Sequence, residues 1–259
     1  MKFALYSDLH LEFSRSANWV PPELDVDVVL LAGDIHTGSS GLDWAGKTFA
    51  SWKSRPEVLY LPGNHEFYNA NYDALIEVFR TPRPGVVALD QSVLSWTPVT
   101  GPSVRLLGCT LWSDFALHGS SKISFHKEQA RLQMNDYRLI RRNGRMLTPA
   151  DTAKIFEQSV AWLDLELSKP WDGRTVIVTH NAPHPDCVEE RYRGSAISPA
   201  FVSDLRWLMR KHRIDLWCFG HTHGNCDFKA KEGCRIVSNQ MGYPGEGVLG
   251  FRPELVIEI

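Results

Sequence analysis

Five short polar clusters, each directly after an apolar run, carry side chains that could bind metal ions. They are Asp8-Leu9-His10, Gly33-Asp34, Gly63-Asn64-His65-Glu66, Thr179-His180 and Gly220-His221-Thr222-His223. Carboxylate oxygens, amide oxygens and imidazole nitrogens are ligands for hard and borderline divalent metals. No cysteine belongs to the set, which argues against a structural zinc finger or an iron–sulfur cluster. The clusters therefore indicate a metal site built from oxygen and nitrogen donors.

The candidate ligands are too numerous for one tetrahedral ion. They suit two ions about 3.5–4 Å apart that share a carboxylate, which is the arrangement of two-metal phosphoryl-transfer sites. Glycine precedes Asp34, Asn64 and His221, which fits a sharp turn directly after each strand. Two such cations acidify a bridging water to hydroxide near neutral pH, and this hydroxide is the expected nucleophile.

The elements that must position these clusters are short runs rich in β-branched and aromatic residues. We expect strands at Phe3–Tyr6, Val26–Leu31, Val58–Leu61, Val86–Leu89, Arg105–Leu111, Thr175–Val178, Leu216–Phe219, Arg235–Ser238 and Leu255–Ile259. Binding sites of parallel sheets form at the carboxyl ends of the strands. Five strand ends lying side by side would therefore bring all the clusters into one pocket.

Helical patterns separate several of these strands, and their alternation in the first third predicts parallel βαβ units. Phe156, Val160, Leu163 and Leu167 mark one helix face, and Thr148-Pro149 supplies its start. Ser198-Pro199 predicts a second helix start, with Phe201, Leu205 and Leu208 on the inner face. Residues 239–247 read as loop and turn that join the last two strands.

The segment from Trp112 to Leu147 is the least regular part of the chain. We expect it to be an insertion, or a flap near the active-site cleft, within a single domain over residues 1–259. Its residues Asn135–Arg138 could lie over the site. The basic run from Arg138 to Arg145 could hold a substrate phosphate, because arginine forks fit phosphate oxygens. A solvated basic face is the alternative.

Taken together, the five clusters resemble the full signature of the calcineurin-like metallophosphoesterases, over positions 8 to 223. The resemblance is to small single-domain bacterial members. It implies an α/β fold in which two facing β-sheets are flanked by helices on both sides, a four-layer αββα architecture. It also implies metal-ligand roles for Asp8, His10, Asp34, Asn64, His180, His221 and His223.

Within this resemblance each residue has an expected role. One ion is held by Asp8, His10 and His223, the other by Asn64, His180 and His221, with Asp34 bridging both. The expected catalytic residues are His65, Asn64 and Asp34, with His65 facing the scissile phosphate as the acid for the leaving group. Asn64, Tyr68 and Arg138 are the expected substrate contacts. We expect His36 and His184 to lie near the site or at the surface without binding metal.

The expected activity is that of a dinuclear-metal-dependent hydrolase of phosphoric esters, a phosphodiesterase acting on a small phosphorylated substrate. A phosphomonoesterase (a nucleotide or protein phosphatase), a nuclease and a non-catalytic metal-binding scaffold are the alternatives. The charge balance, 28 basic against 30 acidic residues, argues against stable nucleic-acid binding, which favours a basic surface. The expected cofactors are two divalent or trivalent ions of Mn, Fe, Zn or Co.

Composition bounds the remaining possibilities. The 259 residues, 43% hydrophobic and 22% charged, are typical of a globular chain with a sizeable core. The five cysteines form no C-x-x-C pair, which is typical of reduced thiols in the cytoplasm. No apolar run is long enough to span a membrane, and no leader pattern precedes the first strand. We therefore expect a cytoplasmic protein without membrane contact, and its oligomeric state stays open.

Overall fold

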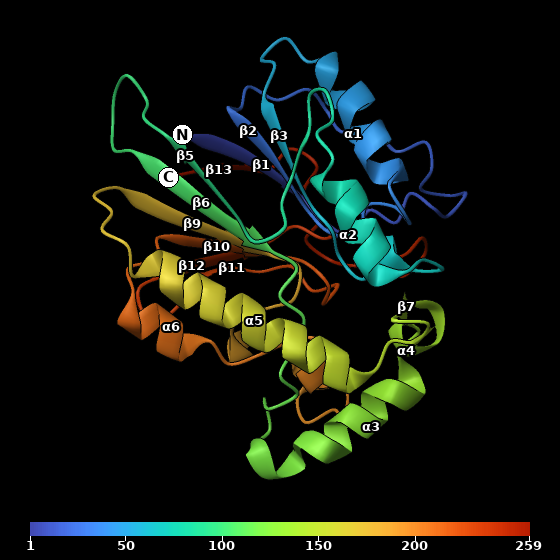
Figure 1. Ribbon diagram of the computed structural model, residues 1–259. Helices are drawn as coiled ribbons and strands as arrows, with labels where there is room; N and C mark the ends of the chain where they lie inside the picture. The colour runs from blue at the N-terminus through green and yellow to red at the C-terminus, as the bar shows by residue number, and fades with distance from the viewer.

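The computed structural model describes all 259 residues and contains two β-sheets that face each other between layers of helices (Figure 1). Helices α1 (Ser40–Ala50) and α2 (Tyr72–Arg80) cover the outer face of one sheet. Helices α5 (Pro149–Leu167) and α6 (Arg206–Lys211) cover the outer face of the other. The expected four-layer arrangement of helices, sheet, sheet and helices is confirmed.

The first sheet has five strands in the order β13-β1-β2-β3-β4. Its members are β1 (Lys2–Tyr6), β2 (Val28–Ala32), β3 (Glu57–Leu61), β4 (Val87–Ala88) and β13 (Val256–Glu258). Strands β1 to β4 are parallel, and β13 closes the edge antiparallel to β1. The two chain ends therefore lie side by side (Figure 1), and the Met1 ammonium donates to the Ile259 carbonyl at 3.2 Å.

The second sheet has six strands in the order β11-β12-β10-β9-β6-β5. Its members are β5 (Ser92–Trp96), β6 (Val104–Cys109), β9 (Arg174–Thr179), β10 (Leu216–Phe219), β11 (Asp227–Lys229) and β12 (Arg235–Ser238). The inner four strands are parallel, and the edge strands β5 and β11 are antiparallel. The sequence predicts all the inner strands of this sheet but neither β5 nor β11, which are short and contain no fully buried residue.

Successive residues of a strand serve two different core layers. Val28, Leu30 and Ala32 of β2 belong to the apolar cluster between the two sheets. Val29 and Leu31 belong to the larger cluster under the helices. Both faces of β2 are thus covered, which explains why its sequence is apolar without alternation.

Helix α5 begins as the sequence predicts. The Thr148 hydroxyl accepts from the Asp151 backbone N–H at 3.3 Å, and the Asp151 carboxylate accepts from the Thr148 N–H at 2.9 Å. These reciprocal bonds form a capping box, and Pro149 occupies the first turn. Phe156 and Leu163 are buried on its inner face.

The predicted helix at Ser198 is wrong. Only a short 3-10 turn, Ser198–Ala200, forms there, and α6 starts later, at Arg206. In between, the Ser203 N–H donates to the Ala182 carbonyl at 3.0 Å, and the Ala182 N–H donates to the Phe201 carbonyl at 3.1 Å. Pairing with the segment after His180 replaces the helical hydrogen bonds.

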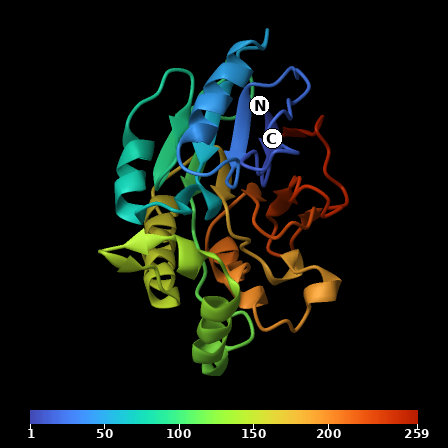
Figure 2. The same ribbon diagram turned by 90° about the vertical axis from the view of Figure 1, so that its right-hand side faces the viewer.

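The segment from Trp112 to Leu147 is more regular than its sequence indicates. It contains α3 (Ile123–Gln133), α4 (Asp136–Leu139) and a hairpin of β7 (Arg141–Arg142) and β8 (Arg145–Met146). Helix α3 is mostly polar and buries only His126 and Ala130, so it lacks the apolar period that reveals a helix. Figures 1 and 2 show α3 at one end of the molecule, beyond the sheets.

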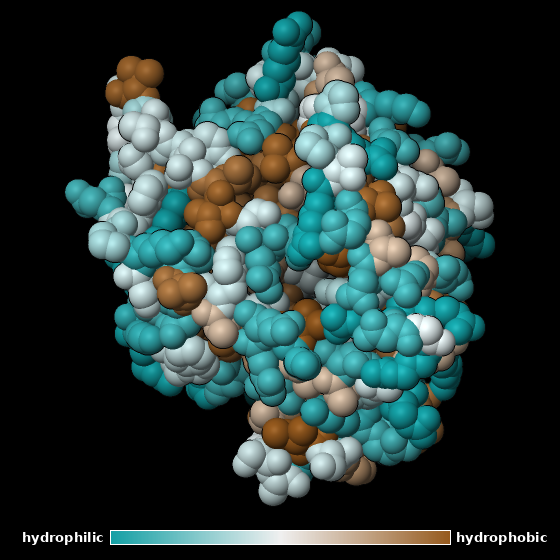
Figure 3. All heavy atoms as spheres, viewed as in Figure 1, coloured by the Kyte–Doolittle hydropathy of each residue, from teal (hydrophilic) through white to brown (hydrophobic).

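The face shown in Figure 3 is largely hydrophilic, and its main apolar area lies between the two sheets near β5. Leu94 and Trp96 pack half-buried against the inter-sheet core at this rim. None of the helices combines the length and the apolar character needed to span a bilayer.

Candidate active site

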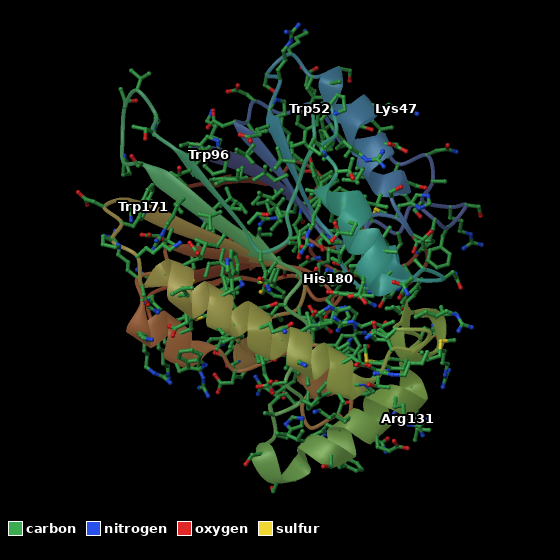
Figure 4. The ribbon with its side chains drawn as sticks, in the orientation of Figure 1. Lys47, Trp52, Trp96, Arg131, Trp171 and His180 are labelled. Atoms are coloured by element: carbon green, nitrogen blue, oxygen red, sulfur yellow. The ribbon has the colours of Figure 1, made fainter.

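The five polar clusters meet at one place because both sheets end there. The first sheet contributes Asp8, Asp34 and Asn64, which follow β1, β2 and β3, and the second contributes His180, His221 and His223, which follow β9 and β10. Figure 4 shows His180 in the interior, where the strands of the two sheets end. Each of these side chains is buried.

The backbone at these positions is strained in a consistent way. Positive φ angles of 47–71° occur at five candidate ligands, namely Asp8, His10, Asp34, His221 and His223. Residues with a Cβ rarely adopt this left-handed conformation, and such outliers concentrate at functional sites. The turns aim the side chains of successive strands into one space.

Two glycines make this approach possible. A Cβ on Gly33 would lie 2.3 Å from His180 Nδ1, and a Cβ on Gly63 would lie 2.3 Å from Asp34 Oδ1. Neither contact is sterically possible, so only glycine lets the two sheets bring their side chains this close.

One group of metal-ligating atoms comprises Asp8, His10 and His223, whose donor atoms lie within 4.8 Å of one another. His223 Nε2 is 3.3 Å from Asp8 Oδ1 and 3.2 Å from His10 Nε2. The other nitrogens of the two imidazoles face carboxylates. His223 Nδ1 lies 2.6 Å from Glu246 Oε2, and His10 Nδ1 lies 3.2 Å from Glu12 Oε1. Both rings are thus oriented with Nε2 toward the site.

A second group comprises Asp34, His180 and His221, again with donor atoms within 4.8 Å. His180 Nε2 lies 3.3 Å from Asp34 Oδ1 and 3.1 Å from Asn64 Oδ1. His180 Nδ1 donates to the Ala32 carbonyl at 2.8 Å, which turns Nε2 toward the carboxylate. Asp34 also forms a third group with His10 and His65, so its carboxylate lies within reach of histidines from both of the other groups.

The donor set fits metal cations. Two imidazole nitrogens facing each other at 3.2 Å, between His10 and His223, can share only one proton, whereas a cation satisfies both lone pairs. Burial, reinforced by the charge of His180, lowers the pKa of His221 to about 3, so its ring is neutral. Burial lowers the pKa of His180, but the nearby Asp34 carboxylate outweighs this effect and raises the pKa to about 9. A cation bound there must displace that proton.

His65 lies at the mouth of this cluster. Its Nδ1 donates to Glu12 Oε1 at 2.8 Å, and its Nε2 lies 2.9 Å from the Tyr243 hydroxyl. Although burial lowers it, the charges of Asp34 and Glu12 raise the pKa of His65 above its usual value. Nε2 is therefore the nitrogen presented to the site.

Asn64 is held by a buried polar triangle. Its Nδ2 donates to Asp136 Oδ1 at 2.9 Å and lies 3.2 Å from the Tyr68 hydroxyl, which itself donates to Asp136 at 2.8 Å. Asp136 belongs to the segment from Trp112 to Leu147, so this segment reaches the site. With Nδ2 engaged, Asn64 presents its Oδ1 to the ion position.

Glu66 ties the loops together from beneath. Its two carboxylate oxygens accept from the backbone N–H groups of Asp34, Ile35 and Gly63 and from the Tyr60 hydroxyl, at 2.7–3.0 Å. The side chain is fully buried, which raises the pKa of Glu66 to about 7, and the four hydrogen bonds offset the cost of burying this polar group. The turn after β2 is thereby locked to the turn after β3.

A cavity of about 340 Å³ opens beside the cluster. Seven predicted site residues or their neighbours border it directly: Asp34, Asn64, His65, Tyr68, Asp136, His221 and His223. Asn135 and Met134 border it too, at the end of α3. Asp8, His10 and His180 lie deeper, behind this lining.

Arg138 does not border the cavity, contrary to its expected role as a substrate contact. It is exposed, and its guanidinium donates to the Leu132 carbonyl. Arg142 pairs with Asp73, and Arg145 forks onto Asp151 at the start of α5. Arg142 and Arg145 thus serve local ion pairs, and Arg138 a local hydrogen bond, rather than the cavity.

His36 and His184 lie outside the ligand groups, as expected. Sequence reasoning missed Glu12, Tyr243 and Glu246 as site residues. The spacing Asp-x-His-x-Glu over residues 8–12 could have indicated Glu12, because a carboxylate two residues beyond a ligand histidine is a frequent partner for its second nitrogen. No sequence signal marks Tyr243 or Glu246, which arrive on the long loop between β12 and β13.

Residues 1–225 match the protein family described as calcineurin-like phosphoesterase. Among curated proteins, the chain is 28% identical to the uncharacterized protein L509 of Acanthamoeba polyphaga mimivirus, over 98% of this chain and 95% of the viral one. Among solved structures, it is similar to a phosphopantetheinyl hydrolase of Mycobacterium tuberculosis, with a TM-score of 0.72, 19% identity, and coverage of 94% and 90% of the two chains. A dimetal phosphatase of Danio rerio shares a TM-score of 0.51 and 17% identity, with 92% and 86% covered.

Proposed function

Since this chain belongs to the calcineurin-like phosphoesterase family, we propose that it is a two-metal hydrolase of phosphoric esters that prefers small diesters. The observation that carries the proposal is the pair of buried ligand groups, Asp8-His10-His223 and Asp34-His180-His221, which are connected by a third group of Asp34 with His10 and His65. Asn64 completes the second group through its Oδ1. When bound, two cations supply an acidified water and neutralise charge on the phosphate oxygens.

The protein side chains have distinct tasks in this reaction. Asp34 holds the two halves of the site together, and Asn64 Oδ1 is fixed toward the ion position by Asp136 and Tyr68. His65 Nε2 is the nitrogen oriented toward the cavity, with its other nitrogen on Glu12. It is placed to give a proton to the departing alkoxide, as a general acid.

The preference for diesters follows from the charges around the cavity. The charged residues that border it besides the ligands and His65 are the acids Asp136, Glu189 and Glu246, and no lysine or arginine borders it. A phosphomonoester carries about two negative charges at pH 7, and a diester carries one. A wall of carboxylates opposes the monoester more strongly, since like charges repel at short range.

A hydrolysis panel tests the proposal. Chelated protein is resupplied with Mn, Fe, Zn or Co and assayed on p-nitrophenyl phosphate and on bis(p-nitrophenyl) phosphate. We expect metal-dependent turnover with a higher kcat/KM for the diester. Metal-dependent turnover of the monoester alone would favour a phosphatase, and no turnover with any metal would favour the scaffold alternative. A phosphopantetheinyl ester is included in the panel because the similar mycobacterial protein is a phosphopantetheinyl hydrolase. At 19% identity this similarity is one of fold.

A further inference from the structure

The cavity next to the ligand cluster continues past the chemistry into an apolar chamber. The apolar residues of its wall are Met134 at the end of α3 and Val188, Ile197, Phe201 and Val202 in the segment that follows β9, and the polar residues Gln133, Tyr192, Ser195 and Ser198 of the same segments lie among them. The two parts of this wall meet directly. His126 Nδ1 of α3 donates to the Ala196 carbonyl at 2.8 Å, and the His118 ring reaches the Ser195 carbonyl at 3.2 Å. The chamber is therefore a formed part of the fold.

The near wall joins this chamber to the ligands. The Phe201 ring stacks on the imidazole of His221, with centroids 4.5 Å apart and an angle of 22° between the ring planes. An organic group attached to a phosphate at the ion positions would thus pass directly from His221 onto Phe201. The cavity volume of about 340 Å³ suits a small organic group.

The charge pattern excludes an anionic group from the chamber. Asp136, Glu189 and Glu246 border the cavity, and Asp136 Oδ2 is buried without a hydrogen-bond partner. The nearest arginines of the loop are engaged with acids, Arg191 with Glu189 at 2.5 Å and Arg193 with Glu190 at 2.9 Å. No lysine or arginine borders the cavity to pair with a second phosphate or a carboxylate inside it.

We propose that the substrate is a phosphate ester whose alcohol portion is uncharged and largely apolar, and that this portion occupies the chamber between Phe201, Val188, Ile197 and Met134. The inference rests on the proposed function for the position of the phosphate. Beyond the proposed function, it excludes polyanionic substrates, such as nucleoside polyphosphates and sugar bisphosphates, because the acids that border the cavity would repel their additional negative charges. Burial of each methylene in such a chamber strengthens binding by about two- to fourfold.

Calorimetric binding of alkylphosphonates to the metal-loaded protein tests this, because each ligand carries one organic group only. The series is methyl-, butyl-, hexyl- and 5-carboxypentylphosphonate, the last having the length of the hexyl chain with a terminal charge. We expect Kd to fall by about tenfold or more from methyl to hexyl and to return to the methyl value for the carboxylated chain. A flat series, or equal binding of the hexyl and carboxypentyl ligands, would overturn the proposal.

Two variants test whether the organic group of the ligand binds in this chamber. Val188→Lys and Ile197→Lys add a cation at half-buried positions, and Val99→Lys, at a fully exposed loop position, is the control. We expect each chamber variant to weaken the hexyl ligand by about tenfold and to strengthen the carboxypentyl ligand by as much, with the control unchanged. Unchanged ligand preference in folded chamber variants would refute the assignment, and if neither variant folds, the wild-type series decides.

The readout separates the two proposals. Phosphonate binding is measured without turnover, so chain-length dependence appears even if the protein hydrolyses none of the esters in the panel. Turnover without chain-length dependence would leave the hydrolase standing and remove the apolar chamber as the substrate site.

Discussion

Left-handed backbone at five ligand positions is the most specific residue-level feature of the site. A turn with φ between 47° and 71° at Asp8, His10, Asp34, His221 and His223 carries a conformational cost at each residue. The surrounding hydrogen bonds hold the turns in place, such as those from the His221 N–H to the Asp8 carboxylate at 3.0 and 3.1 Å. The strain is maintained because the packed strands leave the turns no other conformation.

Asp34 is the residue that the proposed two-metal site shares between its two ions. We expect Asp34→Asn to lower the occupancy of both metals and to abolish turnover, because the amide lacks the charge shared between the two groups. Metal analysis of the purified protein, with Asp25→Asn as a control whose side chain is 92% exposed, is the measurement. Two metal equivalents with normal turnover in Asp34→Asn would contradict the bridging role.

Glu12 connects a ligand to the proposed acid. Its Oε1 accepts from His10 Nδ1 at 3.2 Å and from His65 Nδ1 at 2.8 Å. We expect Glu12→Gln to reduce metal affinity or turnover by about 10–100-fold, as is usual for a carboxylate behind a ligand histidine. The exposed Glu77→Gln serves as the control.

The variant His65→Asn separates the effect of Glu12 on the proposed acid, His65, from its effect on the candidate metal ligand, His10. It should leave metal content intact and cut turnover by about 10²–10⁴-fold, the range for a positioned acid. The loss should be smaller for nitrophenyl esters than for alkyl esters, because nitrophenolate departs without a proton. Equal losses for both would leave phosphate binding as the role of His65.

At the scale of elements, the start of helix α5, which covers one face of the second sheet, is determined by hydrogen bonds between neighbouring residues. The hydrogen bond from Arg145, together with those of the Thr148 capping box, lowers the pKa of Asp151 from its usual 3.8 to about 2. The carboxylate therefore favours the folded state whenever it is ionised. Its contribution is fully present above the unfolded pKa of 3.8 and is lost as pH falls toward 2.

We expect Asp151→Asn and Thr148→Ala each to lower the free energy of unfolding by about 1 kcal/mol at pH 7. Chemical denaturation at pH 7 and at pH 3 is the measurement. The gap between wild type and Asp151→Asn should shrink at the lower pH, whereas the gap for Thr148→Ala should change less. An Asp151→Asn deficit that stays constant between the two pH values would argue against the capping carboxylate.

At the scale of the whole molecule, the candidate ligands join the two sheets. Each ligand group contains residues from both sheets: Asp8 and His10 with His223, and Asp34 with His180 and His221. A bound ion therefore adds a link between halves of the protein that also meet through the apolar inter-sheet core and through hydrogen bonds such as that from the His221 N–H to Asp8. Metal binding and sheet packing should stabilise each other.

Chelation should consequently lower the melting temperature. An ion at 1,000 times its Kd adds about 4 kcal/mol, which corresponds to about 8–16 °C for a chain of this size. Differential scanning calorimetry with and without chelator, followed by metal return, measures the shift. Asp34→Asn should show a much smaller shift, and an equal shift in both proteins would place the stabilising ion elsewhere.

The sequence predicts the fold and the site to different extents. Inner strands such as Val28–Ala32 are predictable because burial on both faces demands an unbroken apolar run. The start of α5 is predictable because its cap is local. Helix α3 and the edge strands β5 and β11 are not, since most of their residues are exposed or half-exposed and they contain no long apolar run.

For the site, the chain itself determined which residues are candidates for the chemistry, because each polar cluster stands at the end of its own strand and the ligand types belong to the local turns. The tertiary structure alone decided what surrounds them. Glu12, Asp136 and Tyr243 reach His65 and Asn64 from separate loops, and the Arg138–Arg145 run turns away from the cavity. Contacts between distant loops depend on how two sheets pack face to face, and no local pattern of residues encodes that packing.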